Sequence, residues 1–254
     1  KTDIFFAATG TYPAYAAFHG VAVDGDGNVL VGDRQNKRIV ALDKNGKVIR
    51  EIEGITHLDA LALAPGSKTL YATTRTGGVH AGKGEIKLLK FADWTRDTKP
   101  TVVLPLGGDY AYSPNTCLGV ARNGKENLIW VAYTPFPVRI YRDKGSAFEL
   151  AKDFGQAASQ RALDLQHFAV DRKTENVYIA DGFGRCFRLD DWKNPDFKRL
   201  GIGAISVSID ARSRYLYCHA DRRPVVRYRI EGGELTPDIP GGAKVPPPGK
   251  GKGR

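Results

Sequence analysis

The sequence predicts an all-β protein of the β-propeller type, built from four-stranded antiparallel blades. Three observations favour this fold. Short apolar runs recur in similar order, and the repeats start roughly 40 to 60 residues apart, as in propeller blades with insertions. Asn-Gly and Asp-Gly turns, which adopt the positive φ of tight hairpins, separate many of the runs. Helical periodicity is weak along the whole chain of 254 residues.

The clearest repeat covers residues 19–54 and contains four short β-runs. The first run ends at Asp24 and is followed by a Gly-Asp-Gly-Asn turn. The second ends at Asp33, and the turn at Asn45–Gly46 separates the third from the fourth. Four runs joined by tight turns predict one antiparallel sheet in sequence order.

The same order of events returns along the chain. In each copy an apolar run, ending in Ala-Val-Asp or a related sequence, comes before a turn. These runs are the expected innermost strands of the blades, near 19–24, 58–64, 117–122, 165–171 and 204–210. The second and third copies are looser, and the second carries insertions. Five blades are therefore visible, and no two of these strands should pair in one sheet.

The segment from Gly20 to Ile39 reads G-V-A-V-D-x-x-G-N-V-x-V-x-D-x-x-N-x-R-I and resembles the NHL repeat. The resemblance implies a ring of six NHL-like blades. NHL-like propellers serve as protein-binding, RNA-binding and enzymatic scaffolds alike, so it does not by itself imply a function. Five visible blades make either an unusual five-bladed ring or part of a six-bladed one. The sequence has no methionine, not even at position 1, which favours a piece of a longer chain with the sixth blade outside it.

Three regions are expected. Residues 1–18 hold an N-terminal segment in which Ile4–Ala8 reads as a strand that could close the ring, and residues 19–239 form the propeller. Residues 240–254 are a basic Pro/Gly segment, predicted to be a disordered tail or linker. This tail holds four of the ten net positive charges, so the remaining domain is only mildly basic.

Composition excludes several classes of protein. No run approaches the ~20 apolar residues of a membrane span. Three widely spaced cysteines make neither a disulfide framework nor a zinc motif, and at least two read as buried strand residues. No P-loop or G-x-S-x-G motif is present. We expect a monomeric domain of a larger chain, with a secreted or periplasmic location as the preferred hypothesis.

Candidate site residues stand where each innermost strand begins, because these positions face one mouth of a propeller channel. They are more polar than the start of a strand requires. Arg34, beside the first hairpin, belongs to the same predicted ligand-binding set, which comprises His19, Asp59, Asn115, Gln166, His167 and Arg34.

Two enzyme families resemble this pattern. Peptidyl-hydroxyglycine amidating lyases hold zinc with channel-mouth histidines, which implies a metal set of His19, Asp59 and His167 here. His167 is one residue out of register with Asp59, a shift that a bulge could correct. Gluconolactonase-like propellers imply calcium with Asn115 as a ligand, but His19 stands where that family has an acidic residue.

The hairpins between second and third strands suggest a different surface. Asp33, Asp181 and Asp221 end second strands and should cap these hairpins by accepting backbone hydrogen bonds. The arginines at or beside them could form a basic rim for nucleic acid, namely Arg34, Arg38, Arg185, Arg222 and Arg223.

The sequence favours a non-enzymatic propeller that binds a protein or small-molecule ligand at one channel mouth. The alternative is a metal-dependent lyase or lactonase-type hydrolase that uses the same residues with zinc or calcium. The alternative would be favoured if three or more of the candidate residues lay within reach of one metal ion, namely of His19, Asp59, Asn115, Gln166 and His167.

Overall fold

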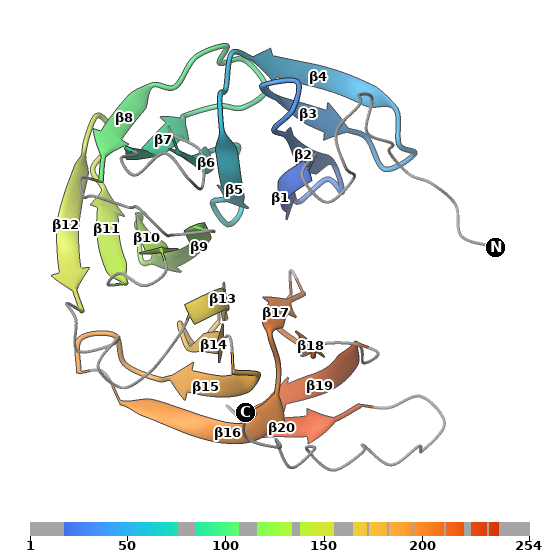
Figure 1. The fold of residues 1–254 in the computed structure, drawn as a ribbon, viewed down its shortest axis with the longest axis vertical. Coiled ribbons are helices and arrows are strands. Elements are labelled where there is room, and N and C mark those ends of the chain that lie inside the picture. Colours follow the sequence, from blue (N-terminus) through green and yellow to red (C-terminus); the bar gives the residue numbers. More distant parts are fainter. Residues whose placement is uncertain are drawn as a thin grey trace. The chain divides into compact units, whose positions relative to one another are not determined.

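The computed structural model describes residues 18–75, 85–106, 116–133, 138–154, 165–171, 173–181, 183–194, 196–210, 212–220, 225–232 and 234–238 (Figure 1). For Phe18, His19, Asn123, Tyr133, Leu165 and Gln166 it describes the backbone and not the side chain. The described residues form strands and turns without helices. The chain divides into two compact units, residues 1–134 with 138–153 and residues 135–137 with 154–254.

Three four-stranded sheets make up the first unit. Their strands are β1 (Phe18–Val23), β2 (Val29–Asp33), β3 (Arg38–Leu42) and β4 (Val48–Glu53); β5 (Leu58–Leu63), β6 (Leu70–Arg75), β7 (Ile86–Phe91) and β8 (Val102–Pro105); and β9 (Thr116–Asn123), β10 (Glu126–Tyr133), β11 (Arg139–Asp143) and β12 (Phe148–Asp153). Each sheet is an antiparallel meander in sequence order. The first strands β1, β5 and β9 pack against one another in series, as the innermost strands of adjacent blades do.

Two more sheets make up the second unit. Their strands are β13 (Leu165–Val170), β14 (Val177–Asp181), β15 (Arg185–Leu189) and β16 (Phe197–Gly203), followed by β17 (Ser206–Ile209), β18 (Tyr215–His219), β19 (Val226–Glu231) and β20 (Glu234–Pro237). Strand β17 packs on β13 and β14 of the preceding blade.

The predicted fold class is confirmed: the chain is an all-β protein of β-propeller blades. All five predicted innermost strands are found within a residue or two of their expected positions, and each begins a sheet of its own. The strand expected at Ile4–Ala8 and the tail at 240–254 lie outside the described residues. A sixth blade stays a prediction.

Aspartates directly follow the first strands of three blades and organise the hairpin turns there. Asp24 accepts hydrogen bonds through Oδ1 from the backbone N–H groups of Asp26 and Asn28, both at 2.9 Å. Asp171 and Asp210 bind the turns after β13 and β17 in the same way. The recurring Asp at this position therefore has a structural role in turn formation.

Asp24 also predicts a pH dependence of stability. Its burial opposes ionisation, but hydrogen bonds from Asn28 and Lys68 outweigh this effect and lower the pKa of Asp24. Since the folded-state pKa is depressed, the stabilisation is complete above the ordinary pKa near 3.8 and is lost as pH falls through the folded-state value. Asp24→Asn should cost about 1–2 kcal/mol at pH 7. Urea titrations from pH 7 to pH 2 should show this difference shrinking, and a constant difference would contradict it.

The predicted caps between second and third strands are confirmed at the two described positions. Asp33 accepts a hydrogen bond from the Asn36 backbone at 3.2 Å, and Asp181 accepts one from the Arg185 backbone at 2.7 Å. The same aspartates pair with the rim arginines Arg38 and Arg185. Asp221 lies outside the described residues.

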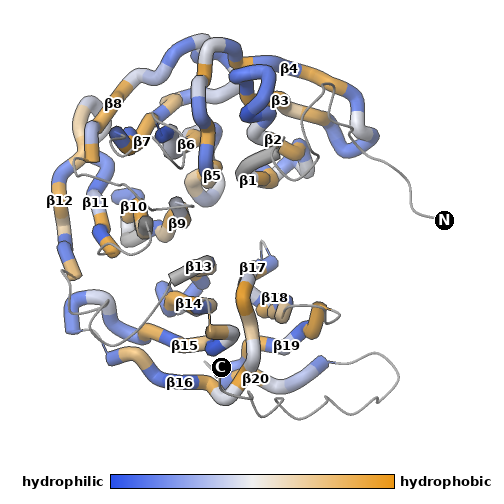
Figure 2. Tube along the Cα trace, in the orientation of Figure 1, coloured by the Kyte–Doolittle hydropathy of each residue, from blue (hydrophilic) through white to orange (hydrophobic). Residues whose placement is uncertain are grey.

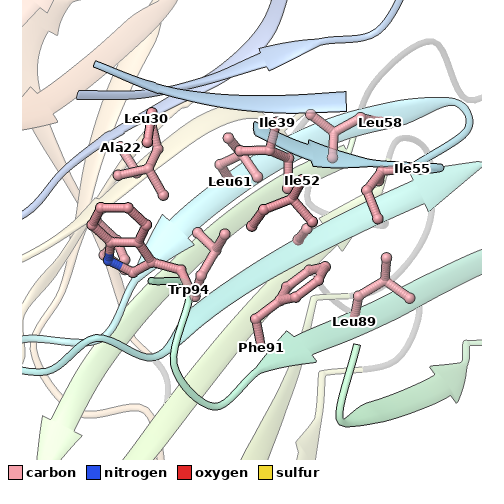
Figure 3. Packing of buried hydrophobic residues seen from close by; sticks show 14 residues of the cluster. Ala22, Leu30, Ile39, Ile52, Ile55, Leu58, Leu61, Leu89, Phe91 and Trp94 are labelled. Atoms are coloured by element: carbon pink, nitrogen blue, oxygen red, sulfur yellow. The ribbon is translucent and has the colours of Figure 1, made fainter. Parts of the chain in front are cut away.

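The core of the first unit lies between neighbouring sheets. Figure 3 shows Ala22, Leu30 and Ile39 of the first sheet facing Leu61 and Phe91 of the second. Outer strands are less buried, and Figure 2 shows hydrophilic residues interspersed with hydrophobic ones along β4 and β12. The first two sheets are thus held together by apolar faces buried between them.

The last sheet has two contrasting faces. Val207, Leu216, Cys218 and Tyr228 belong to the buried cluster that this sheet shares with the preceding one. The register of β17 to β19 places Ser208, Tyr217 and Arg227 together on the opposite face. All three cysteines are buried and form no disulfide, in agreement with the expectation that at least two are buried strand residues.

Candidate functional site

Three innermost strands begin with a β-bulge. In the second blade, Leu58 pairs with Thr74 and Ala60 with Thr73, so Asp59 is the inserted residue. The register of the first blade shifts between Phe18 and Val21, the interval that contains His19. A bulge re-aims side chains at the end of a strand and often lies beside a functional site.

The fourth blade has the same bulge. Leu165 pairs with Asp181 and His167 with Ala180, which makes Gln166 the inserted residue. Gln166 therefore corresponds to Asp59, and His167 to Ala60. The third and fifth blades begin in regular register. Because both blades carry the bulge, Gln166 and not His167 stands at the position of Asp59. The bulge therefore does not correct the one-residue shift of His167.

Asp59 lies between two arginines of adjacent blades: Arg34, which follows β2, and Arg75, the last residue of β6. The Arg34 Nη1 atom lies 3.4 Å from Asp59 Oδ1, and the Arg75 Nε atom lies 3.5 Å from Oδ2. The side chains of Asp59 and Arg75 are 2% and 5% exposed, whereas that of Arg34 is 21% exposed. Solvent therefore reaches this group through Arg34.

Threonine hydroxyls complete the group. Thr73 and Thr116 are buried and share a hydrogen bond of 2.7 Å between β6 and β9. The Thr116 hydroxyl also interacts with Asp59. We call Arg34, Asp59, Thr73, Arg75 and Thr116 the strand-start cluster, because each lies at the end of a blade where an innermost strand begins.

Burial dominates the electrostatics of Asp59. Desolvation raises the pKa of its carboxyl group above the ordinary value, although Arg75 and Arg34 act in the opposite direction. Within the part of the chain that the structure describes, neither carboxylate oxygen accepts a hydrogen bond of ordinary geometry. Burial, with a smaller effect of Asp59, also raises the pKa of the Cys117 thiol to about 12, so this cysteine is protonated at neutral pH.

Asp59→Asn should change stability with the opposite pH dependence from Asp24→Asn. Because the folded-state pKa of Asp59 is raised, its ionisation opposes folding. The wild type should therefore lose stability relative to Asp59→Asn as pH rises above 3.8 through the folded-state value. Urea unfolding of both proteins between pH 3 and pH 7 measures this difference. A relative gain by the wild type over that range would contradict the raised pKa.

His167 contacts the neighbouring blade of its own unit. Its Nδ1 atom lies 3.3 Å from the carbonyl oxygen of Val207. Since a carbonyl oxygen can only accept, Nδ1 carries the proton and the lone pair of the neutral ring is on Nε2. The residue as a whole is exposed, but desolvation of its ring lowers the pKa of His167, and the Val207 carbonyl opposes this effect.

The structure brings together two residues of the predicted ligand-binding set, Arg34 and Asp59. The side chains of His19 and Gln166 and the whole of Asn115 are not described, and His167 belongs to the other unit. Among the described residues, no three His, Cys, Asp or Glu residues meet in a group that could hold a metal ion. The metal set of His19, Asp59 and His167 stays a prediction.

Sequence reasoning missed Arg75, Thr73 and Thr116. Arg75 was detectable: Thr74 pairs with Leu58 as Asp33 pairs with Phe18, so Arg75 at the end of β6 corresponds to Arg34 after β2. The threonines gave no comparable signal, because a Thr at a strand end is common in any sheet.

Comparisons with known proteins support the fold and not a family. No protein-family model matches the chain, and no curated protein matches its sequence. A chain in the crystal structure of a mitotic checkpoint complex is similar, with a TM-score of 0.57 and 9% sequence identity. The similarity covers 83% of this chain and 63% of that one. At this identity it shows a shared fold alone. In the described residues, no helix is long and apolar enough to cross a membrane.

Proposed function

We propose that this chain is an NHL-like propeller that binds a protein or small-molecule ligand at the end of the blades where the innermost strands begin, without catalysing a reaction. The observation that carries this proposal is the strand-start cluster. Its buried carboxylate is paired only loosely with two arginines from adjacent blades, and Arg34 is within reach of solvent. A buried carboxylate without ordinary hydrogen bonds is costly for stability, which favours a binding role.

A protein partner is supported by the fact that a chain of similar fold occurs in a protein complex. That chain belongs to a mitotic checkpoint complex. The rim arginines give less support to nucleic acid, because Arg38 and Arg185 are paired with Asp33 and Asp181. Paired guanidiniums contribute less to phosphate binding than free ones.

A capture experiment tests the proposal. Wild-type chain and the Arg34→Glu variant are immobilised, and the protein and small-molecule fractions of an extract are passed over both. We expect a component that the wild type retains and the variant does not. Equal retention by both chains would contradict binding at this site. Conversion of the retained component by the wild type would contradict a non-enzymatic role.

A metal-dependent lyase or hydrolase is the alternative, and one observation favours it. The Nε2 lone pair of His167 is oriented by the bond from Nδ1 to a backbone carbonyl, an arrangement that ligand histidines often have. Asp59 fits a metal less well, since two guanidiniums lie within 3.5 Å of it. Elemental analysis of the purified wild type and of His167→Ala would favour the alternative if zinc or calcium were present and lost in the variant.

A further inference from the structure

The strand-start cluster combines two positive charges with one negative charge. Arg34 and Arg75 lie on either side of Asp59, at 3.4 and 3.5 Å from its two oxygens. Thr73 and Thr116 add hydroxyl groups and no charge. The described members of the cluster therefore have a net charge of +1 in a desolvated place, where an anion is attracted more strongly than in water.

The geometry points to a carboxylate as the group that this site binds, an inference that rests on the proposed function. A guanidinium presents a planar fork of N–H donors that matches a carboxylate bidentately. A single negative charge would balance the cluster, whereas a phosphate dianion would exceed the balance and be repelled more strongly by Asp59. Metal cations are disfavoured by the same two arginines.

Arg34 is the residue through which a ligand reaches the site. It follows β2 in the hairpin of the first blade, and its side chain is 21% exposed, against 5% for Arg75. Both arginines also make other interactions within the protein. An incoming carboxylate therefore competes with existing contacts, and we expect an affinity that depends mainly on Arg34.

Arg38 provides a matched control. It lies at the other end of the same hairpin, and its side chain is 23% exposed. Its guanidinium pairs with Asp33 at 3.0 Å and with Glu51 at 2.8 Å, on the rim and not with Asp59. Arg34→Gln and Arg38→Gln remove the same charge from similarly exposed positions. A nonspecific effect of charge would weaken anion binding equally in both variants.

Asp59 gives a result of opposite sign. If the site binds a carboxylate, Asp59→Asn removes a competing negative charge and should tighten binding. If Asp59 were instead a metal ligand, the same variant would lose its bound ion and gain no affinity for an anion. The Asn side chain has nearly the same shape, so this variant changes charge with little change in packing.

Calorimetric titration of the full chain with three probes tests the inference: glutarate, an end-blocked hexaglutamate peptide and inorganic phosphate. We expect glutarate, the peptide or both to bind, with affinity about tenfold lower in Arg34→Gln, within about twofold of wild type in Arg38→Gln, and higher in Asp59→Asn. Binding of glutarate alone identifies a small-molecule site, and binding of the peptide alone identifies an acidic protein segment. Thermal unfolding of each variant checks that it is folded.

Three results would overturn the inference: no binding of either carboxylate probe, equal weakening in both arginine variants, or tighter Arg34-dependent binding of phosphate. If the carboxylates fail but a captured component still depends on Arg34, ligand binding at this site stands and the ligand class is wrong. If capture also shows no dependence on Arg34, the proposed function itself fails.

Discussion

Asp143→Ala should lower the free energy of unfolding by about 3–5 kcal/mol, because it breaks a buried ion pair between two blades. Asp143 Oδ1 accepts a hydrogen bond of 2.7 Å from Lys90 Nζ, and both side chains are only 7% exposed. Its Oδ2 accepts from the Tyr71 hydroxyl, which in turn accepts from Asn127. Removal of the carboxylate leaves a buried ammonium and a buried hydroxyl without their acceptor.

The energy follows from desolvation. Burial, together with Asp143, raises the pKa of Tyr71, so its hydroxyl stays a donor at any moderate pH. Lys90 keeps one bond, to the Gly145 carbonyl at 2.8 Å, which does not neutralise its charge. An uncompensated buried charge costs far more than the pair contributed.

Urea unfolding measures this effect, and an exposed pair on the same blade gives the control. Arg139 and Asp153 lie 2.8 Å apart on β11 and β12, with side chains 26% and 34% exposed. Asp153→Ala should cost less than about 1 kcal/mol. The double variant Lys90→Met with Asp143→Leu should recover most of the stability lost in the single variant. Equal effects of the two aspartate substitutions would show that the Lys90 pair is not buried in solution.

The five blades were predictable because each copy repeats both its apolar strands and its turn residues. Asp24, Asp171 and Asp210 recur because a side-chain oxygen must bind the backbone of the next turn. The pairing of Lys90 with Asp143 was not predictable, because a Lys or Asp within a strand of alternating polarity is normally an exposed residue. Their burial depends on how two blades pack, which no local pattern encodes.

The candidate site was predictable in position and not in composition. Arg34 and Asp59 entered the predicted set for separate reasons, and the structure places them in one ion pair. The bulges that carry Asp59 and Gln166 have no residue signature, since a bulge is an extra residue of any type in one strand of a pair. Which residue occupies the bulge in each blade is therefore known only from the strand pairing in the structure.

Gly20→Ala should lower the free energy of unfolding by about 2–5 kcal/mol, because the added methyl group has no space and the backbone is in the left-handed region. Gly20 has φ +78°, in the left-handed region that residues with a Cβ rarely adopt. A Cβ at this position would lie 2.6 Å from the Leu61 backbone nitrogen and 3.0 Å from the Ala60 carbonyl carbon. These are backbone atoms of the adjacent blade, so no side chain can rotate to make room.

The same substitution should impair ligand binding. Gly20 lies in the bulge of the first blade beside His19, and it packs on Ala60, the residue after Asp59. Relief of the overlap requires β1 to move away from β5, which would alter the separation between Arg34 of the first blade and Asp59 of the second. We therefore expect Gly20→Ala to weaken Arg34-dependent binding under conditions in which the variant is still folded.

Gly25→Ala supplies the comparison for this last prediction. Gly25 lies in the exposed turn after β1, with no atom within 4 Å of the added Cβ and no positive φ. Its substitution should change the free energy of unfolding by no more than about 0.5 kcal/mol. Urea unfolding and carboxylate titration of both variants separate close packing between blades from a general intolerance of β-carbons near β1. If the two variants were equally stable, β1 and β5 would have to lie further apart at Gly20 than the 2.6 Å and 3.0 Å distances from its added Cβ indicate.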